Sequence, residues 1–132
     1  MALSSVVMCS SNCIFCNIPN DRIIADNDLC FAIFDGFPVS EGHTLIIPKR
    51  HVADYFDLTC GEIIAMQQML REQKLILDAR LSPDGYNVGI NVNEAAGQTV
   101  FHVHMHLIPR YKGDVENPRG GVRGVIPSKQ KY

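Results

Sequence analysis

The chain has 132 residues, of which 46% are hydrophobic and 20% charged, and its formal net charge is −2. This length suits one domain with a single core, which we expect to span residues 1–132, and is too short for two. The near-neutral charge does not favour a nucleic-acid-binding protein, and apolar runs such as residues 45–47 are too short to cross a membrane. Residues 1–16 lack the basic start of a secretory signal, so we expect a cytoplasmic protein.

Residues 1–12 have no clear periodicity and are predicted to form a loose arm. Further along the chain, Pro, Gly, Asn and Asp separate short runs of apolar and β-branched residues. These runs predict strands over residues 23–25, 29–34, 43–47, 86–92 and 99–108, with a long helix between the third and the fourth. This order indicates an α+β fold with a mainly antiparallel sheet of about five strands.

The predicted helix has a clear start and a clear end. Thr59 and Glu62 have the spacing of a capping box, with Thr59 as the N-cap. The turn residues 82–85 end the helix. Apolar residues at helical spacing predict its buried face, at Ile63, Met66, Leu70, Leu77 and Leu81.

The end of the chain, residues 110–132, is predicted to be irregular because of its Gly and Pro content. It holds six basic and two acidic residues, so its net charge is +4. This charge suits either a solvated tail or a segment that contacts phosphate.

Three of the five histidines, His102, His104 and His106, alternate with the apolar residues Val103 and Met105. On an extended strand, alternate side chains point to the same face, so the three imidazoles would lie in a row. Three interpretations compete for this row: a polar sheet face, a metal site, or nucleophilic catalysis by an imidazole through a covalent histidine intermediate.

Residues just before the histidines favour nucleophilic catalysis on an anionic substrate. Gly97 allows the backbone to approach an anion closely, while Gln98 and Thr99 offer hydrogen bonds without adding charge. Acidic residues, which a metal hydrolase commonly uses as ligands, are absent from the histidine run itself.

The run HVHMHLIPR, preceded by AAGQTVF, with GHTLIIPKRH upstream and CIFC near the start, resembles the histidine triad (HIT) superfamily. The resemblance extends from about Cys13 to Arg123. It implies a hydrolase or transferase that acts on the α-phosphate of a nucleotide, with His104 attacking phosphorus to form a nucleotidyl-histidine. Water would then release a nucleoside monophosphate, and His106 would donate to a phosphate oxygen or to the leaving group.

The same resemblance assigns residues to the nucleotide. It implies that Asp35 binds the ribose hydroxyls and that Asn91, with Asn93 as its near competitor, contacts the phosphate side. Gln98 and Thr99 would hold the phosphate or the leaving group. His43 would be a fourth active-site imidazole. As alternatives, Asp35 is a turn residue before a glycine, and Asn91 and His43 are polar residues of a strand.

A single C-x-x-C, here Cys13 and Cys16, is a weak signal on its own. The resemblance to the zinc-bearing branch of the superfamily implies a structural zinc held by Cys13, Cys16, His51 and His102. No redox cofactor is expected, and the odd number of cysteines without an export signal predicts reduced thiols.

The resemblance leaves two substrate classes open, dinucleoside polyphosphates and purine nucleoside phosphoramidates. Arg119 and Arg123 in the basic tail suit the distal phosphates of a polyphosphate, which favours the first class. A homodimer, without nucleic-acid or membrane partners, is implied. The rival hypotheses are a non-catalytic nucleotide-binding module and a metallohydrolase.

Overall fold

The computed structural model describes residues 12–132, so the arm predicted over residues 1–12 lies outside the described residues except for Asn12. Five strands form one sheet with the order β1-β2-β3-β5-β4, and every neighbouring pair is antiparallel. The strands are β1 (Ile23–Asp26), β2 (Cys30–Phe34), β3 (Thr44–Pro48), β4 (Gly85–Ile90) and β5 (Met105–Arg110). The predicted α+β fold is thereby confirmed.

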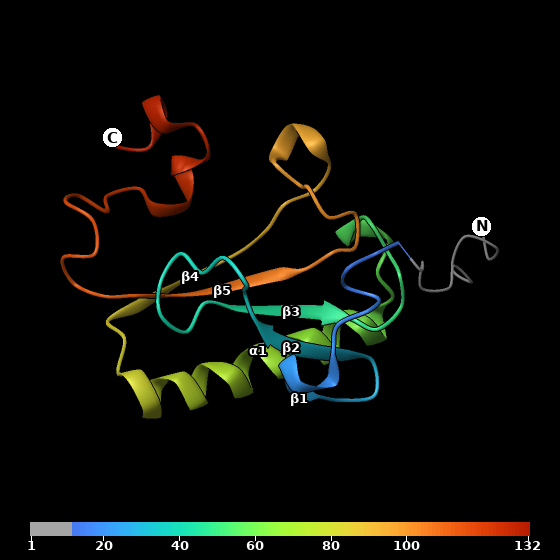
Figure 1. The fold of residues 1–132 in the computed structure, drawn as a ribbon. Helices are drawn as coiled ribbons and strands as arrows, with labels where there is room; N and C mark the ends of the chain where they lie inside the picture. Colours follow the sequence, from blue (N-terminus) through green and yellow to red (C-terminus); the bar gives the residue numbers. More distant parts are fainter. Residues whose placement is uncertain (1–11) are drawn as a thin grey trace.

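Helix α1 (Cys60–Leu81) packs along one face of the sheet, below it in Figure 1. The capping box is present, because Thr59 Oγ1 accepts the backbone N–H of Glu62 at 3.1 Å and Glu62 Oε1 accepts that of Thr59 at 2.8 Å. The helix ends at Ser82, whose backbone is left-handed with a φ of 47°. Among residues 12–132, none of the helices combines the length and the apolar character that a bilayer span requires.

The buried face of α1 differs in part from the face that apolar spacing predicts. Ile63, Leu70 and Leu81 are only half-buried. Two polar side chains of the helix are buried instead. Glu62 accepts hydrogen bonds from Arg50, and Gln73 Nε2 donates to the sulfur of Met69. The full buried set is Glu62, Ala65, Met66, Met69, Gln73 and Leu77. Ile63 and Leu70 still pack against the core, and the two buried polar side chains are tolerated because hydrogen bonds satisfy them.

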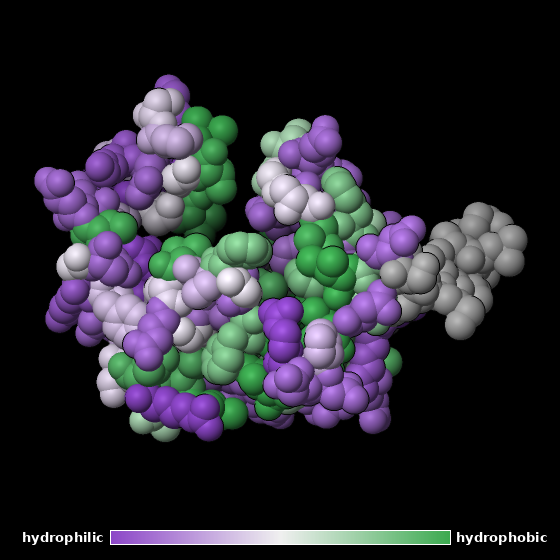
Figure 2. Space-filling view, viewed as in Figure 1, coloured by the Kyte–Doolittle hydropathy of each residue, from purple (hydrophilic) through white to green (hydrophobic). Residues whose placement is uncertain are grey.

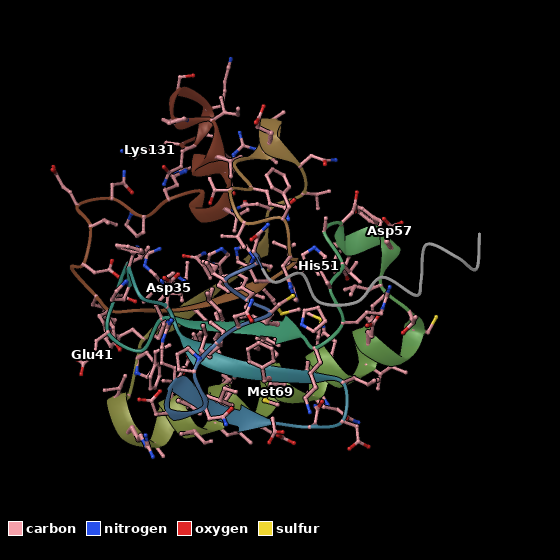
Figure 3. The ribbon with its side chains drawn as sticks, turned by 45° about the vertical axis from the view of Figure 1, so that its right-hand side comes forward. Asp35, Glu41, His51, Asp57, Met69 and Lys131 are labelled. Atoms are coloured by element: carbon pink, nitrogen blue, oxygen red, sulfur yellow. The ribbon has the colours of Figure 1, made fainter. Side chains whose placement is uncertain are left out.

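Both faces of the sheet are packed. On the helix side, Ala32, Ile46 and Met105 join Met66 and Met69 in one apolar cluster. On the opposite side, the segment before β1 lays Phe15 over a second cluster, formed with Phe31, Ile33, Leu45 and Ile47. Figure 3 shows Met69 beneath the sheet, and Asp35 and His51 above it.

The strand that carries the histidines is shorter than predicted. It begins at Met105 instead of residue 99, so only His106 of the three histidines lies within β5. The buried Gln98 side chain bonds to the backbone of Ala53, Asn93 and Val100. In addition, the Val103 N–H donates to Val52 O at 2.7 Å. These bonds hold residues 98–104 as a bent segment in place of a strand ladder.

Short 3-10 helices occupy the loops and the chain end: η2 (Asn20–Arg22), η3 (Tyr55–Asp57), η4 (Glu94–Ala96), η5 (Gly121–Val125) and η6 (Pro127–Lys129). The C-terminal segment therefore carries more regular structure than the irregular tail that its Gly and Pro content predicts. The guanidinium groups of Arg119 and Arg123 lie over the Tyr132 ring at 4.9 and 4.8 Å from its centroid. This segment and the loop that carries η4 rise from the sheet on the side away from α1 (Figure 1).

Candidate active site

The sheet register brings together histidines that are far apart in the sequence. Strands β3 and β5 pair with Leu45 opposite His106. His43 lies two residues before Leu45, so its side chain points to the same face of the sheet as Leu45 and lies diagonally opposite His106. Gly42, with a φ of +90°, makes the entry to β3 possible, because a Cβ there would lie 2.8 Å from a Leu81 methyl group. The result is a 2.9 Å hydrogen bond between His43 Nε2 and His106 Nδ1.

A cavity of 410 Å³ lies on this face of the sheet. His43, His104 and His106 form part of its lining, with Asp35 and Thr99 at other points of the wall. Figure 2 shows the surface hollowed between the C-terminal segment and the loop that carries η4. The volume is in the range of small-molecule sites, which makes this cavity the candidate active site.

The three triad rings remain together although the segment is bent. Phe15 contacts the ring of His102 at 6.2 Å and that of His104 at 4.9 Å between centroids. The His104 ring in turn lies 5.2 Å from the His106 ring. The rings therefore share the side of the sheet that faces away from α1.

Hydrogen bonds fix which nitrogen of His104 is free. Its Nδ1 lies 2.9 Å from the carbonyl oxygen of His102. A carbonyl oxygen only accepts, so Nδ1 carries the proton and donates it. The ring's lone pair is therefore on Nε2, as a nucleophilic imidazole requires.

A second chain of hydrogen bonds fixes the tautomer of His106. The backbone N–H of Val39 donates to His43 Nδ1 at 3.0 Å, so His43 carries its proton on Nε2. That proton is donated to His106 Nδ1, which leaves His106 with its own N–H on Nε2. His106 therefore presents a hydrogen-bond donor on the edge of its ring opposite His43.

Burial determines the charge of these rings. The pKa of His106 is lowered to about 4, mainly by burial and to a lesser extent by the nearby His104 and His43 rings, against an opposing effect of Asp35. Burial also lowers the pKa of His43, against the effect of Asp35, whose Oδ2 lies 3.4 Å from His43 Nε2. Both rings are neutral at pH 7, so the tautomers assigned above apply at that pH.

A second cluster lies beside the triad, formed by the four predicted metal ligands. The ligand atoms of Cys13, Cys16, His51 and His102 all lie within 4.8 Å of one another. The His102 Nδ1 is 3.4 Å from Cys13 Sγ and 3.5 Å from Cys16 Sγ, and the His51 Nδ1 is 3.3 Å from Cys16 Sγ. A tetrahedral zinc ion with ordinary bond lengths separates sulfur and nitrogen ligands by about 3.5 Å.

The tautomer of His102 also fits a metal ligand. Its Nε2 lies 2.7 Å from the carbonyl oxygen of Pro48, so it donates there and leaves the lone pair on Nδ1, toward the thiols. Burial lowers the pKa of His102 to about 4, which keeps the ring neutral. We call residues 13–16, which carry both thiols, the metal knuckle.

The structure distributes the predicted nucleotide contacts unevenly. Asp35, Asn91 and Thr99 line the cavity. Gln98 does not, because its Oε1 accepts the Asn93 N–H and its Nε2 donates to two backbone carbonyls. These backbone bonds occupy the Gln98 side chain, for which the sequence predicts a phosphate contact.

Asp35 is a turn residue, as the alternative interpretation predicts, and it also lies at the cavity. Its Oδ1 accepts the Phe37 N–H at 2.8 Å, as a turn aspartate does, while the residue also lines the cavity. The tail arginines do not line the cavity. Arg119 and Arg123 lie against Tyr132, and Arg123 also donates to two backbone carbonyls within the tail.

Among the site residues that sequence reasoning missed, Arg22 and Val39 contribute polar groups. Arg22 lines the cavity wall and donates to Phe34 O at 3.3 Å, and only its basic side chain next to a turn could have drawn attention to it. Val39 supplies the backbone N–H that sets the His43 tautomer. A backbone donor leaves no mark in the side-chain sequence, so no signal could have found it.

Comparison with known proteins identifies the family. The HIT domain family matches residues 17–113 of the chain. The chain belongs to the HIT family. Members of this family bind nucleotides and are typically nucleotide hydrolases or transferases.

Individual HIT relatives are similar over most of the chain. An "Uncharacterized 16.1 kDa HIT-like protein" of Mycoplasma pneumoniae is 40% identical over 109 residues, covering 80% of this chain and 76% of the relative. The crystal structure of a zinc-bound histidine triad family protein from Mycobacterium smegmatis is 36% identical, covers 80% of each chain and has a TM-score of 0.72. The Arabidopsis thaliana protein named adenylylsulfatase HINT3 is 32% identical over 108 residues, covering 79% of this chain and 55% of the relative.

Proposed function

We propose that the chain is a nucleotidyl hydrolase or transferase that attacks the α-phosphate of a purine nucleotide with His104 Nε2. The observation that carries this proposal is the bond from His104 Nδ1–H to the His102 carbonyl, which leaves the lone pair on Nε2 of a cavity-lining ring. The carbonyl also stabilises the positive charge that the ring gains when Nε2 bonds to phosphorus.

The reaction proceeds in two displacements. In the first, a bond forms between Nε2 and phosphorus while the bond from phosphorus to the leaving group breaks. In the second, a bond forms between a water oxygen and phosphorus while the bond from phosphorus to Nε2 breaks, so His104 recovers its lone pair. The water loses one proton to the solvent, and a nucleoside monophosphate is released. In both steps His106 Nε2–H donates to a non-bridging oxygen, where charge accumulates in the transition state.

The neutral state of His106 favours one substrate class. A phosphate or sulfate leaving group departs as an anion and needs no proton, whereas an amine does. His106 is a donor with a pKa lowered to about 4 and holds no extra proton at pH 7. We therefore propose phosphoanhydride substrates, such as diadenosine polyphosphates, with adenylyl sulfate as a second anhydride in view of the name of the Arabidopsis relative. Phosphoramidates are the alternative class.

The remaining contacts follow the cavity wall. We propose that the Asp35 carboxylate binds the ribose hydroxyls and that Asn91 and Thr99 bind the phosphate side. Gln98 instead holds the bent segment that presents Thr99 and His104.

We also propose that the metal knuckle binds a structural zinc ion with His51 and His102. The ligand distances and the His102 tautomer support this, and bound zinc would join the N-terminal segment to the sheet. His104 and His106 are left for the substrate.

The metallohydrolase hypothesis fits the structure less well. Asp35, His43 and His106 are close enough to form a second metal site. However, His43 Nδ1 accepts the Val39 N–H, so metal binding at its Nε2 would require a ring stripped of both protons.

The oligomeric state is a separate proposal. Strand β4 is an edge of the sheet, with Val88 44% exposed, and Ile64 and Leu75 of α1 are exposed as well. We propose that these surfaces pair in a homodimer. Light scattering across a concentration series tests it, and a monomer at all concentrations contradicts it.

The variant His104→Ala tests the proposed function. We expect turnover of diadenosine polyphosphates to fall by at least about 10³-fold, while binding of AMP, followed by calorimetry, changes little. A non-catalytic binding module would show AMP binding and no turnover in the parent protein. Undiminished turnover in His104→Ala would refute the proposal.

A further inference from the structure

The residue Phe15 connects the metal knuckle to the nucleophile. It lies between Cys13 and Cys16 in the chain. Only 8% of the residue is exposed, and it forms part of the lining of the cavity. The same ring contacts the His104 ring edge-on, with 4.9 Å between centroids and an interplanar angle of 75°.

The position of Phe15 is set from two sides. Below it, the cluster of Phe31, Ile33, Leu45 and Ile47 forms a rigid apolar floor on the sheet. At its flanks, the knuckle closes with a bond from the Cys16 N–H to Cys13 O, and the two thiols lie against His102 and His51. A ring held in this way has little freedom to move unless the knuckle moves.

The His104 ring depends on such a neighbour. The hydrogen bond from its Nδ1 fixes one point of the ring but leaves rotation about that bond open. The two rings that close off this rotation are Phe15 at 4.9 Å and His106 at 5.2 Å, with interplanar angles of 75° and 63°. Attack in line with the leaving group requires a defined direction of the Nε2 lone pair.

We propose that Phe15 is a positioning residue, through which the metal knuckle fixes the orientation of the His104 ring. The inference rests on the proposed function for its kinetic consequence. It adds that the occupied knuckle supports the nucleophile through an aromatic contact, in addition to joining the N-terminal segment to the sheet.

The variant Phe15→Leu tests this kinetically, with Ile47→Val as its matched control. Leu keeps an apolar side chain but loses the ring edge, so we expect kcat to fall about tenfold and KM to change by less than about twofold. Ile47 belongs to the same cluster and, unlike Phe15, does not line the cavity, so Ile47→Val should lower the melting temperature slightly and leave kcat unchanged. Phe15→Tyr, which keeps the ring, should retain most of the activity.

Two kinetic outcomes would overturn the inference. A higher KM with an unchanged kcat would make Phe15 a substrate contact, and an equal loss of kcat in Ile47→Val would make its effect a general one of core packing. If circular dichroism shows that Phe15→Leu is unfolded, Phe15→Met takes its place, because a flexible methionine fills the space without a ring.

A measurement without substrate separates this inference from the proposed function. Imidazole NMR spectra of ¹⁵N-histidine-labelled protein with saturating zinc should show sharp His104 signals in the parent. In Phe15→Leu the His104 signals should broaden, because the ring exchanges between orientations, while those of the ligand His102 stay sharp. A shift of the His104 signals without broadening is only the loss of the Phe15 ring current and would refute the positioning role. Failure of the parent to turn over any nucleotide would refute the proposed function and leave this result unaffected.

Discussion

The buried pair of Arg50 and Glu62 should be a major contributor to the stability of the chain. Glu62 is 3% exposed and accepts three hydrogen bonds, from Arg50 Nε at 3.0 Å, Arg50 Nη2 at 2.8 Å and the Thr59 N–H at 2.8 Å. Arg50 also donates to Asp57 O at 3.1 Å, so the pair ties the loop after β3 to the start of α1. That loop carries the metal ligand His51.

The variant Glu62→Gln removes the charge and turns an amide NH₂ toward one of the donors. A carboxamide has one acceptor oxygen, which can keep the two bonds that Oε1 accepts from Arg50 Nη2 and the Thr59 N–H. Its NH₂ group then faces Arg50 Nε, so a donor faces a donor at the third bond. Removing one partner of a fully buried pair costs about 3 to 5 kcal/mol, but the Arg50 side chain is 22% exposed, so with two bonds kept we expect a loss of about 2 kcal/mol. Urea unfolding of the zinc-saturated protein, with matched m-values, measures it.

Two control variants make this prediction specific. The Lys74–Asp78 pair on α1 is exposed, and its nitrogen and oxygen are 2.8 Å apart, so Lys74→Met should cost at most about 0.5 kcal/mol. The double variant Arg50→Met/Glu62→Leu removes both charges and should be more stable than Glu62→Gln. A loss below about 1 kcal/mol in Glu62→Gln, or a double variant that is less stable still, would refute the reasoning.

Three further predictions concern pH, metal and backbone strain. Because burial lowers the pKa of His106 to about 4 in the folded chain, the unfolded chain binds a proton first as the pH falls, so the free energy of unfolding should decrease from pH 6.5 toward pH 4. Urea titrations at several pH values should show that the free energy of unfolding decreases less steeply with falling pH in His106→Gln than in the parent. An equal pH dependence in the two proteins would contradict this. Chelation of the zinc-loaded parent should lower its melting temperature by more than about 10 °C. The melting temperature of Cys13→Ser should not change on chelation. An unchanged melting temperature in the parent would contradict the metal site. Asn93 has φ 72° and ψ 166°, a conformation that costs most residues about 1 to 3 kcal/mol, so Asn93→Gly should stabilise the chain by about 1 kcal/mol and Asn93→Ala should not. A melting temperature lowered by the glycine would contradict this.

Local signals were sufficient for the elements and for part of the site. The capping box of Thr59 and Glu62 marks the start of α1 because its two bonds lie within four residues. The strands follow from short apolar runs between turn residues. The metal knuckle was anticipated through the resemblance to the HIT superfamily, since nothing local connects Cys13 with His102, 89 residues later.

Contacts made by the fold were beyond local reasoning. His43 and His106 are 63 residues apart, and only the register of β3 and β5 brings them to 2.9 Å. Gln98 was expected to bind phosphate because it is polar and precedes the histidines. Its burial and its three backbone partners depend on where Ala53, Asn93 and Val100 lie in space.

The proposed nucleophile can be identified directly on the protein. Rapid mixing with a diadenosine polyphosphate or adenylyl sulfate, followed by an alkaline quench, should trap an adenylyl group, and peptide mapping with NMR should place its phosphorus on His104 Nε2. An adduct on another residue or on Nδ1, or turnover that proceeds without any adduct, would contradict the central claim.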